Sequence, residues 1–271
     1  MRTRYTQVIA STLVVCGCVV GASIASALEC TTTITVDADD TLTLSADYVA
    51  DGSVSNSPCF ELENNATLDL NGHTISRTNP INTASAAIQC LSSSTTVTDS
   101  ASLANKGAIT GESWSVGILD CETVDGVVIE GGGGSIITGI KTSSTRVAKS
   151  ILNNVVNDTT TGLELVFQDS NSIMANNVVR PTNAALTVVG STASGSGPIV
   201  EDNVFTEYGI GIFKSGNDKI RIRNNLLMRR DTEFVDGDCL DIVATGSTVS
   251  GNVCDCADQC VPDVPYSLPW F

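Results

Sequence analysis

Two stretches that begin 23 residues apart decide the fold: ILNNVVNDTTTGL at residues 151–163 and MANNVVRPTNAAL at residues 174–186. An asparagine followed by an apolar residue is their shared signature, and it recurs with steps of 23, 26, 22 and 27 residues at Asn154-Val155, Asn177-Val178, Asn203-Val204, Asn225-Leu226 and Asn252-Val253. A nearly constant step of this size indicates one structural unit used many times.

A second series, usually a small residue before isoleucine or leucine, runs in step with the first. It appears at Gly117-Ile118, Gly139-Ile140, Gly162-Leu163, Ala185-Leu186, Gly211-Ile212 and Cys239-Leu240. Within each unit apolar residues alternate with polar ones, as at residues 219–223, and no window sustains the spacing of an amphipathic helix. The sequence therefore predicts an all-β, right-handed parallel β-helix of roughly ten turns, stacked about 4.8 Å apart.

The repeat also predicts which side chains do what. The asparagines should occupy left-handed positions in tight turns and hydrogen-bond to one another along the coil axis. If the isoleucines and leucines point inward, alternation turns four neighbours outward on the same sheet, with an ion pair between the first two. These four are Lys141, Glu164, Thr187 and Asp241.

Cysteines are numerous, with ten in the chain and eight after residue 27: Cys30, Cys59, Cys90, Cys121, Cys239, Cys254, Cys256 and Cys260. An even number in an exported chain indicates disulfides, and Cys30 with Cys59 is the favoured pair. Cys59, Cys90 and Cys121 are 31 residues apart, so adjacent coils can also be bridged. The competing interpretation is a zinc site formed by the last four cysteines.

Residues 30–75, from CTTTITVDADDTLTLSADYV to LDLNGHTI, resemble the opening of exported β-helix repeat proteins of the pectin-lyase-like superfamily. The later Asn-Asn-Val turns are similar to the generic repeat of that superfamily, including that of periplasmic copper-binding β-helix proteins. The resemblance covers nearly all of residues 30–260. It implies a protein directed at polysaccharide, either a pectate-lyase-like or glycosidase-like enzyme or a glycan-binding relative, with calcium as a candidate ion.

Composition and the first residues set further limits. With 14 Lys and Arg against 30 Asp and Glu, the net charge of −16 argues against a nucleic-acid partner, and a single histidine excludes a site with several histidines. Residues 1–27 read as a secretory signal peptide, with a lipoprotein signal at Cys18 as the alternative. No later apolar run is long enough to span a membrane. We therefore expect a secreted or periplasmic protein with its β-helix at 28–260 and a tail at 261–271 that caps the last turn.

The best candidates for catalysis are Asp236, Asp238 and Asp241. Residues 236–242 are similar to the Gly-Asp-Asp-Cys stretch of polygalacturonases, in which two aspartates act as acid and base. The match is partial, because Gly237 stands where the first of those aspartates belongs. The competing interpretation is an Asp-Gly turn beside a disulfide.

Substrate binding is predicted at Lys219, Arg221 and Arg223, which alternate with inward isoleucines and share one outer face. This positive stripe could hold a carboxylated sugar, or it could neutralise Glu201, Asp202 and Glu207.

Other features are assigned structural roles or none. His73 is expected in a turn, and the low aromatic content leaves only Trp114 and Trp270 for stacking on sugars. Ice binding requires threonine rows on every turn, and we predict that the pair Thr41 and Thr43 does not persist in later turns. A non-catalytic surface or envelope module is the alternative to a protein that acts on polysaccharide.

Overall fold

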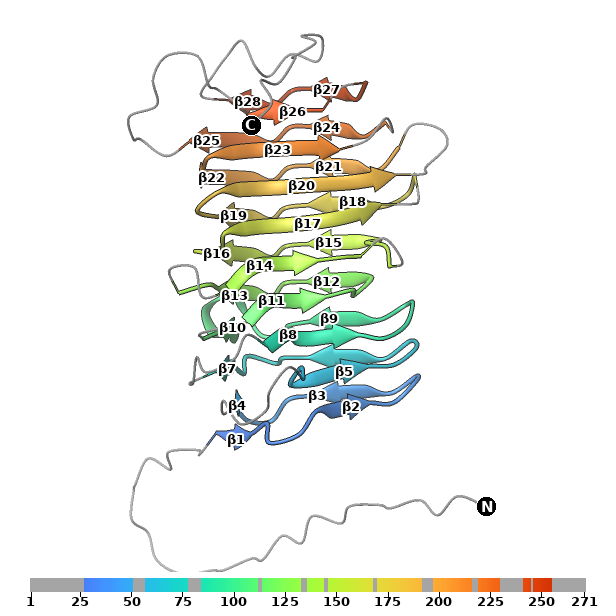
Figure 1. Cartoon of the computed structure of the whole chain (residues 1–271), viewed down its shortest axis with the longest axis vertical. Coiled ribbons are helices and arrows are strands. Elements are labelled where there is room, and N and C mark those ends of the chain that lie inside the picture. The colour runs from blue at the N-terminus through green and yellow to red at the C-terminus, as the bar shows by residue number, and fades with distance from the viewer. Residues whose placement is uncertain are drawn as a thin grey trace, which may run out of the picture.

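The computed structural model describes residues 27–50, 57–77, 84–111, 114–132, 136–143, 146–167, 170–191, 197–215, 219–229, 241–244 and 246–254. In these residues the chain winds as a parallel β-solenoid that visits three sheets in turn and then returns to the first (Figure 1). The predicted all-β fold and parallel β-helix are confirmed. The right hand of the coil and the number of turns stay predictions.

Each sheet takes one strand from each successive coil. Sheet A runs in the order β1 (Leu28–Glu29), β4 (Tyr48–Ala50), β7 (Ile75–Arg77), β10 (Ala108–Thr110), β13 (Val128–Glu130), β16 (Val155–Asn157), β19 (Val178–Arg180), β22 (Val204–Tyr208), β25 (Leu226–Arg229) and β28 (Val253–Cys254). Sheet B runs in the order β2 (Ile34–Val36), β5 (Phe60–Leu62), β8 (Ala84–Cys90), β11 (Trp114–Leu119), β14 (Ile136–Lys141), β17 (Thr161–Phe167), β20 (Ala184–Ser191), β23 (Ile210–Ser215) and β26 (Ile242–Val243).

Sheet C consists of short strands, in the order β3 (Thr41–Thr43), β6 (Thr67–Asp69), β9 (Thr96–Thr98), β12 (Thr123–Asp125), β15 (Ser150–Leu152), β18 (Ile173–Ala175), β21 (Ile199–Glu201), β24 (Arg221–Arg223) and β27 (Thr248–Ser250). All recorded strand pairs are parallel. Among the described residues the one helical element is the short 3-10 helix η1 (Leu103–Asn105), which lies between β9 and β10.

The core forms because the middle residue of most three-residue strands points inward. On sheet C these residues are fully buried from coil to coil, and they include Leu68, Val97, Val124, Ile151, Met174, Val200 and Ile222. Since side chains alternate along a strand, the first and third residues of the same strands face outward. The surface of the solenoid is therefore set by a small, regular subset of positions.

The predicted asparagine ladder is confirmed. The side-chain Nδ2 of Asn154, Asn177, Asn203 and Asn225 each donates to the Oδ1 of the ladder asparagine of the next coil, at 2.9 Å in every case. Each of these Oδ1 atoms also accepts the backbone amide of the previous ladder residue, at 2.9 to 3.1 Å. The ladder satisfies polar groups that are buried between sheets C and A.

The left-handed backbone lies one residue earlier than predicted. Positive φ angles belong to Asn153 (57°), Asn176 (58°), Asp202 (55°) and Asn224 (57°), each directly before a ladder asparagine. The prediction that the ladder asparagines adopt this conformation is therefore wrong. The turn and the link between coils are made by two successive residues. The exposed residue with a positive φ makes the turn, and the buried asparagine after it links the coils.

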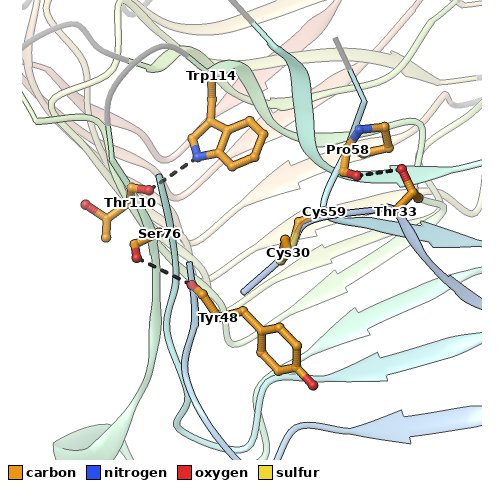
Figure 2. The surroundings of a disulfide bond; sticks show 8 residues. All are labelled: Cys30, Thr33, Tyr48, Pro58, Cys59, Ser76, Thr110 and Trp114. Carbon is orange, nitrogen blue, oxygen red and sulfur yellow. Dashed lines mark hydrogen bonds between the residues drawn. A yellow bond between two sulfur atoms is a disulfide. The ribbon is translucent and has the colours of Figure 1, made fainter. Parts of the chain in front are cut away.

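Disulfides link adjacent coils near the N-terminal end. Figure 2 shows the predicted bond between Cys30 and Cys59, whose Cα atoms lie 5.6 Å apart, and a second bond joins Cys90 to Cys121 with Cα atoms 5.0 Å apart. Both pairs join neighbouring coils, as the cysteine spacing allowed. Cys254 is also disulfide-bonded. The other C-terminal cysteines, Cys239, Cys256 and Cys260, lie outside the described residues.

Candidate functional site

Two of the three catalytic candidates, Asp236 and Asp238, lie outside the described residues, so the acid-base hypothesis is untested for them. The third, Asp241, is fully buried, and its Oδ1 accepts a hydrogen bond of 2.8 Å from the hydroxyl of Tyr208. The prediction that Asp241 points outward is therefore wrong. A carboxylate enclosed in this way is not available to a polymer on the surface.

The error at Asp241 comes from the register of the last coil in sheet B. The sequence series placed Leu240 beside Ile212, whereas the structure pairs Ile212 with Ile242. Asp241 consequently takes the inward position that Gly211 occupies in the coil before. The chain between β25 and β26 is longer than the repeat assumes. The resulting shift of two residues moves Asp241 from the position after the inward residue to the position before it, where the residue is buried in both coils.

The predicted basic stripe lies on the outer face of β24, but its two arginines already have partners. The guanidinium of Arg221 donates to the backbone oxygens of Gly197 and Ser170 at 3.0 to 3.3 Å. Arg223 Nε lies 2.6 Å from Glu201 Oε2, as the neutralising interpretation expected. Lys219 is exposed. A carboxylated sugar would have to share the two guanidinium groups with these protein partners.

Several other charged side chains on the described surface also form ion pairs. Lys141 and Glu164 form the predicted ion pair, with Nζ and Oε1 2.8 Å apart. Arg180 Nε lies 3.3 Å from Glu207 Oε1. Exposed pairs of this kind contribute little to stability.

Sheet C presents a row of threonines that sequence reasoning missed. Thr41 pairs with Thr67, Thr67 with Thr96, Thr96 with Thr123, and Thr123 with Ser150, each as the first outward residue of its strand. The prediction that threonines do not persist after Thr41 and Thr43 is therefore wrong for this sheet. The signal that could have found them is Thr, then Leu or Val, then Thr or Asp, at residues 41–43, 67–69, 96–98 and 123–125.

A second outward row runs beside the first and alternates hydroxyl with carboxylate. Its members in register are Thr43, Asp69, Thr98 and Asp125, and Leu152 ends it. Except for Thr43, which is exposed, the residues of this row are half-buried. We call the two rows together, Thr41, Thr67, Thr96, Thr123, Thr43, Asp69, Thr98 and Asp125, the hydroxyl face.

Asp69 is held in its ionised form. Partial burial alone would raise its pKa, but hydrogen bonds from the hydroxyl and amide of Ser100, the amide of Asn71 and the charge of Lys106 together lower the pKa below its ordinary value. Its Oδ1 accepts the amides of Asn71 and Ser100, both at 2.9 Å. Asp69 is therefore a fixed acceptor on the face rather than a proton donor.

The second row leads into a solvent-open hollow of about 370 Å³ at the corner between sheets C and A. Its lining is polar on most sides and consists of Thr98, Asp99, Ser100, Ala101, Leu103, Lys106, Asp125, Gly126 and Asn153. Asp125 Oδ1 accepts a hydrogen bond of 2.8 Å from Asn153 Nδ2, and the ammonium of Lys106 donates to the backbone oxygen of Asp99. The hollow thus continues the hydroxyl face with acceptors, an amide and one cation.

The hollow exists because Asp99 organises an insertion in this coil. Its two carboxylate oxygens accept the amides of Gly72, Ala101 and Gly107 at 2.9 to 3.0 Å. These bonds hold the ends of the segment that contains η1, whose Leu103 is 89% exposed. The carboxylate here replaces the ladder asparagine of later coils.

The remaining predicted residues carry no site in the described part of the chain. His73 Nδ1 lies 3.3 Å from Asp47 Oδ1, which is a local pair in a turn, as predicted. Trp114 is buried against the guanidinium of Arg77 at 5.0 Å and cannot stack on a sugar. Burial of Arg77 lowers the pKa of its guanidinium. No three His, Cys, Asp or Glu side chains among the described residues are grouped so that they could hold a metal ion.

Comparisons of the chain with protein-family models, with curated proteins and with solved structures found no match. In the part of the chain that the structure describes, no helix has the length and apolar character needed to cross a membrane. The two disulfides are typical of a protein that matures in an oxidising compartment.

Proposed function

We propose that this protein binds an extended, neutral polysaccharide along the hydroxyl face and does not cut it. The observation that carries the proposal is the register of Thr41, Thr67, Thr96 and Thr123 on one outer row. The row repeats at the coil spacing of about 4.8 Å, so it offers regularly spaced hydroxyls that can each donate and accept. A linear polymer with regularly repeated hydroxyl groups is the ligand that matches such a row.

A neutral polymer fits better than an acidic one. The hydroxyl face includes two carboxylates, Asp69 and Asp125, and the whole chain has a net charge of −16. The two carboxylates and the negative net charge would repel a carboxylated sugar. With a neutral sugar, the same carboxylates can accept hydrogen bonds from its hydroxyls. Of the cations proposed from the sequence for an acidic sugar, Arg221 and Arg223 already have protein partners, while Lys219 is exposed.

Binding fits the hydroxyl face better than cleavage does. Glycoside hydrolysis uses a pair of carboxyl groups, one of which must be protonated. Asp69 and Asp125 are separated by one intervening coil, and both carboxyl groups already accept hydrogen bonds from protein donors, Asp69 from the amides of Asn71 and Ser100 and Asp125 from Asn153. Asp241 is buried beneath the surface.

We include in the same proposal that the protein is exported and that it belongs to the pectin-lyase-like superfamily. The resemblance to pectin-lyase-like proteins, the apparent signal peptide at residues 1–27 and the inter-coil disulfides all suit a protein that meets polysaccharide outside the cytoplasm. The signal peptide itself lies almost entirely outside the described residues, which begin at residue 27.

The test is binding by the purified mature chain to soluble neutral polysaccharides, with pectin and alginate as acidic competitors, measured by affinity electrophoresis. We expect the neutral polymers to retard the protein and the acidic ones to have little effect. Replacing Thr67, Thr96 and Thr123 together by valine removes three hydroxyls without changing side-chain shape, and should weaken binding at least tenfold, since each hydrogen bond contributes about 1 kcal/mol.

The matched control is Thr248→Val, because Thr248 lies in the same outward row beside Arg221 at the far end of sheet C. It should leave binding unchanged. Equal loss in both variants, or no binding to any neutral polymer, would overturn the proposal and favour a structural surface module. Release of reducing ends during the assay would show that the protein is an enzyme.

A further inference from the structure

The outer face of sheet A carries an apolar row that no element among the described residues covers. The residue after each ladder asparagine faces outward, and these residues pair in register from Ala108 through Val128, Val155, Val178, Val204 and Leu226 to Val253. Val178 is 39% exposed and Val253 is 63% exposed. The row is the most continuous apolar feature on the described surface.

The row contrasts with the corresponding positions of sheet C. There the first outward residues of the early strands are threonines, and those of the later strands are Ser150, Ile173, Ile199, Arg221 and Thr248, so the apolar run is only two strands long. A solvated sheet face normally alternates apolar inward with polar outward. An apolar row that persists over seven strands is the feature expected of a contact surface.

The neighbouring outward row on sheet A is complementary to itself when its order is reversed. In register it reads Thr110, Glu130, Asn157 and Arg180, and Thr206 follows Phe205, the partner of Val179. A two-fold axis parallel to the strands at the level of Asn157 reverses the coil order and keeps each row opposite its own copy. Glu130 then faces Arg180, Thr110 faces Thr206, and Asn157 faces itself.

We propose that sheet A is the interface between two copies of this chain, packed face to face with their coil axes antiparallel. The apolar rows meet along the middle of the contact, and two Glu130–Arg180 pairs between copies fix the register. Arg180 already contacts Glu207 within its own chain at 3.3 Å. Because the guanidinium has five donor hydrogens, Arg180 can bind both carboxylates.

The size of the surface sets the expected strength. About the two-fold axis at Asn157, the five strands from β10 to β22 face one another; at about 4.8 Å per strand and with two outward rows they cover on the order of 300 Å² per copy, by the usual strand dimensions. That area is below the range of stable, specific protein interfaces. We therefore expect a weak dimer that forms as the protein concentration rises.

The experiment is sedimentation equilibrium of the full mature chain over a wide concentration series. The wild type should shift from monomer to dimer. Arg180→Glu and Glu130→Arg should each weaken the dimer at least tenfold through like charges between copies, and the double variant should recover association because the pairs are restored in reverse. Val155→Lys, which places two ammonium groups at the two-fold axis, should abolish it.

Ile173→Lys is the control, because it places the same charge at an outward position of sheet C. It should associate like the wild type, and circular dichroism should show the same β-sheet content for all variants. A constant monomer mass at every concentration would overturn the proposal. So would a dimer that survives both single charge reversals, since its interface would lie elsewhere.

Discussion

The first coils, from β2 to β13, and the later coils, from β14 to β28, are the same fold linked in two different ways. Covalent bonds join the first coils, at Cys30–Cys59 and Cys90–Cys121. The later coils are joined by the asparagine ladder from Asn154 to Asn252. The difference shows that a β-solenoid needs a link between neighbouring coils, while the chemistry of that link can change along its length.

The two kinds of link also leave different surfaces. The ladder closes the corner between sheets C and A, and it ends where Asn154 Oδ1 accepts the amide of Val127 at 3.0 Å. In the earlier coil Asp99 holds the corner instead, with an insertion and a hollow beside it. The hydroxyl face thus lies on the disulfide-linked half, where the corner between sheets C and A holds an insertion and a hollow as well as a turn.

Loss of the disulfide Cys90–Cys121 should have the largest effect. Closing a loop of 31 residues corresponds to about 3 to 4 kcal/mol in the loop-entropy model. In the Cys90→Ser/Cys121→Ser variant we expect that loss in urea unfolding, with faster amide exchange in β5 to β11. Equal acceleration in β17 to β25 would contradict the idea that each half depends on its own links.

Asn203→Ala should be the corresponding break in the later half. The change removes a buried amide that bonds to Asn177 and Asn225 and leaves the amide of Asn177 without its acceptor. We expect a loss of about 3 kcal/mol in the free energy of unfolding, from several buried hydrogen bonds. Hydrogen exchange should then accelerate in β18 to β25 and not around the disulfides. A loss of under 1 kcal/mol would show that the ladder is not a stabilising link.

A pH titration of stability should sharpen the view of the first half. Because the pKa of Asp69 is lowered in the folded protein, its contribution is complete above the ordinary carboxyl pKa of 3.8 and is lost as the pH falls through the lower folded value. Asp69→Asn should therefore flatten the acid limb of the unfolding free energy against pH. Ser100→Ala, which removes one of its hydrogen bonds, should flatten it less. An unchanged acid limb in Asp69→Asn would contradict the assignment.

The smallest expected effect tests whether the turn residue and the ladder asparagine that follows it have separate roles. Asn176 is exposed and has a φ of 58°, so Asn176→Gly should be nearly neutral, while Asn176→Ala should cost about 1 kcal/mol in the left-handed region. Thermal unfolding of the two variants beside Asn203→Ala would measure this. If Asn176→Ala cost as much as Asn203→Ala, the turn residue and the ladder residue would not have separate roles.

The repeated positions were predictable from the sequence because each of them has the same structural role in successive coils. The ladder asparagines and the inward isoleucines follow from spacing and alternation, both of which are local properties. The pair Cys30–Cys59 was favoured but did not follow from the repeat. The Lys141–Glu164 pair also followed, because it lies where the repeat is most regular. In such coils the register of one strand fixes that of the next.

Features that depend on irregular segments were not predictable in the same way. Asp241 was misplaced because the chain before β26 is longer than the repeat, so counting from Ile212 fails. The threonine row has steps of 26, 29 and 27 residues, which are as regular as those of the asparagines, but its short pattern of Thr, an apolar residue and then Thr or Asp lies in the coils where the asparagine signature is absent. The outward apolar row was missed because alternation restarts after each ladder asparagine, so Val178 faces solvent while Val179 is buried.

The most direct test of the central claim, that the hydroxyl face is where polysaccharide binds, is a hydrogen-exchange footprint of the mature chain with and without a neutral polysaccharide that retards it. We predict slower exchange at residues 41–43, 67–69, 96–98 and 123–125 and no change at 248–250. Protection confined to sheet B, or spread equally over both ends of sheet C, would contradict the claim.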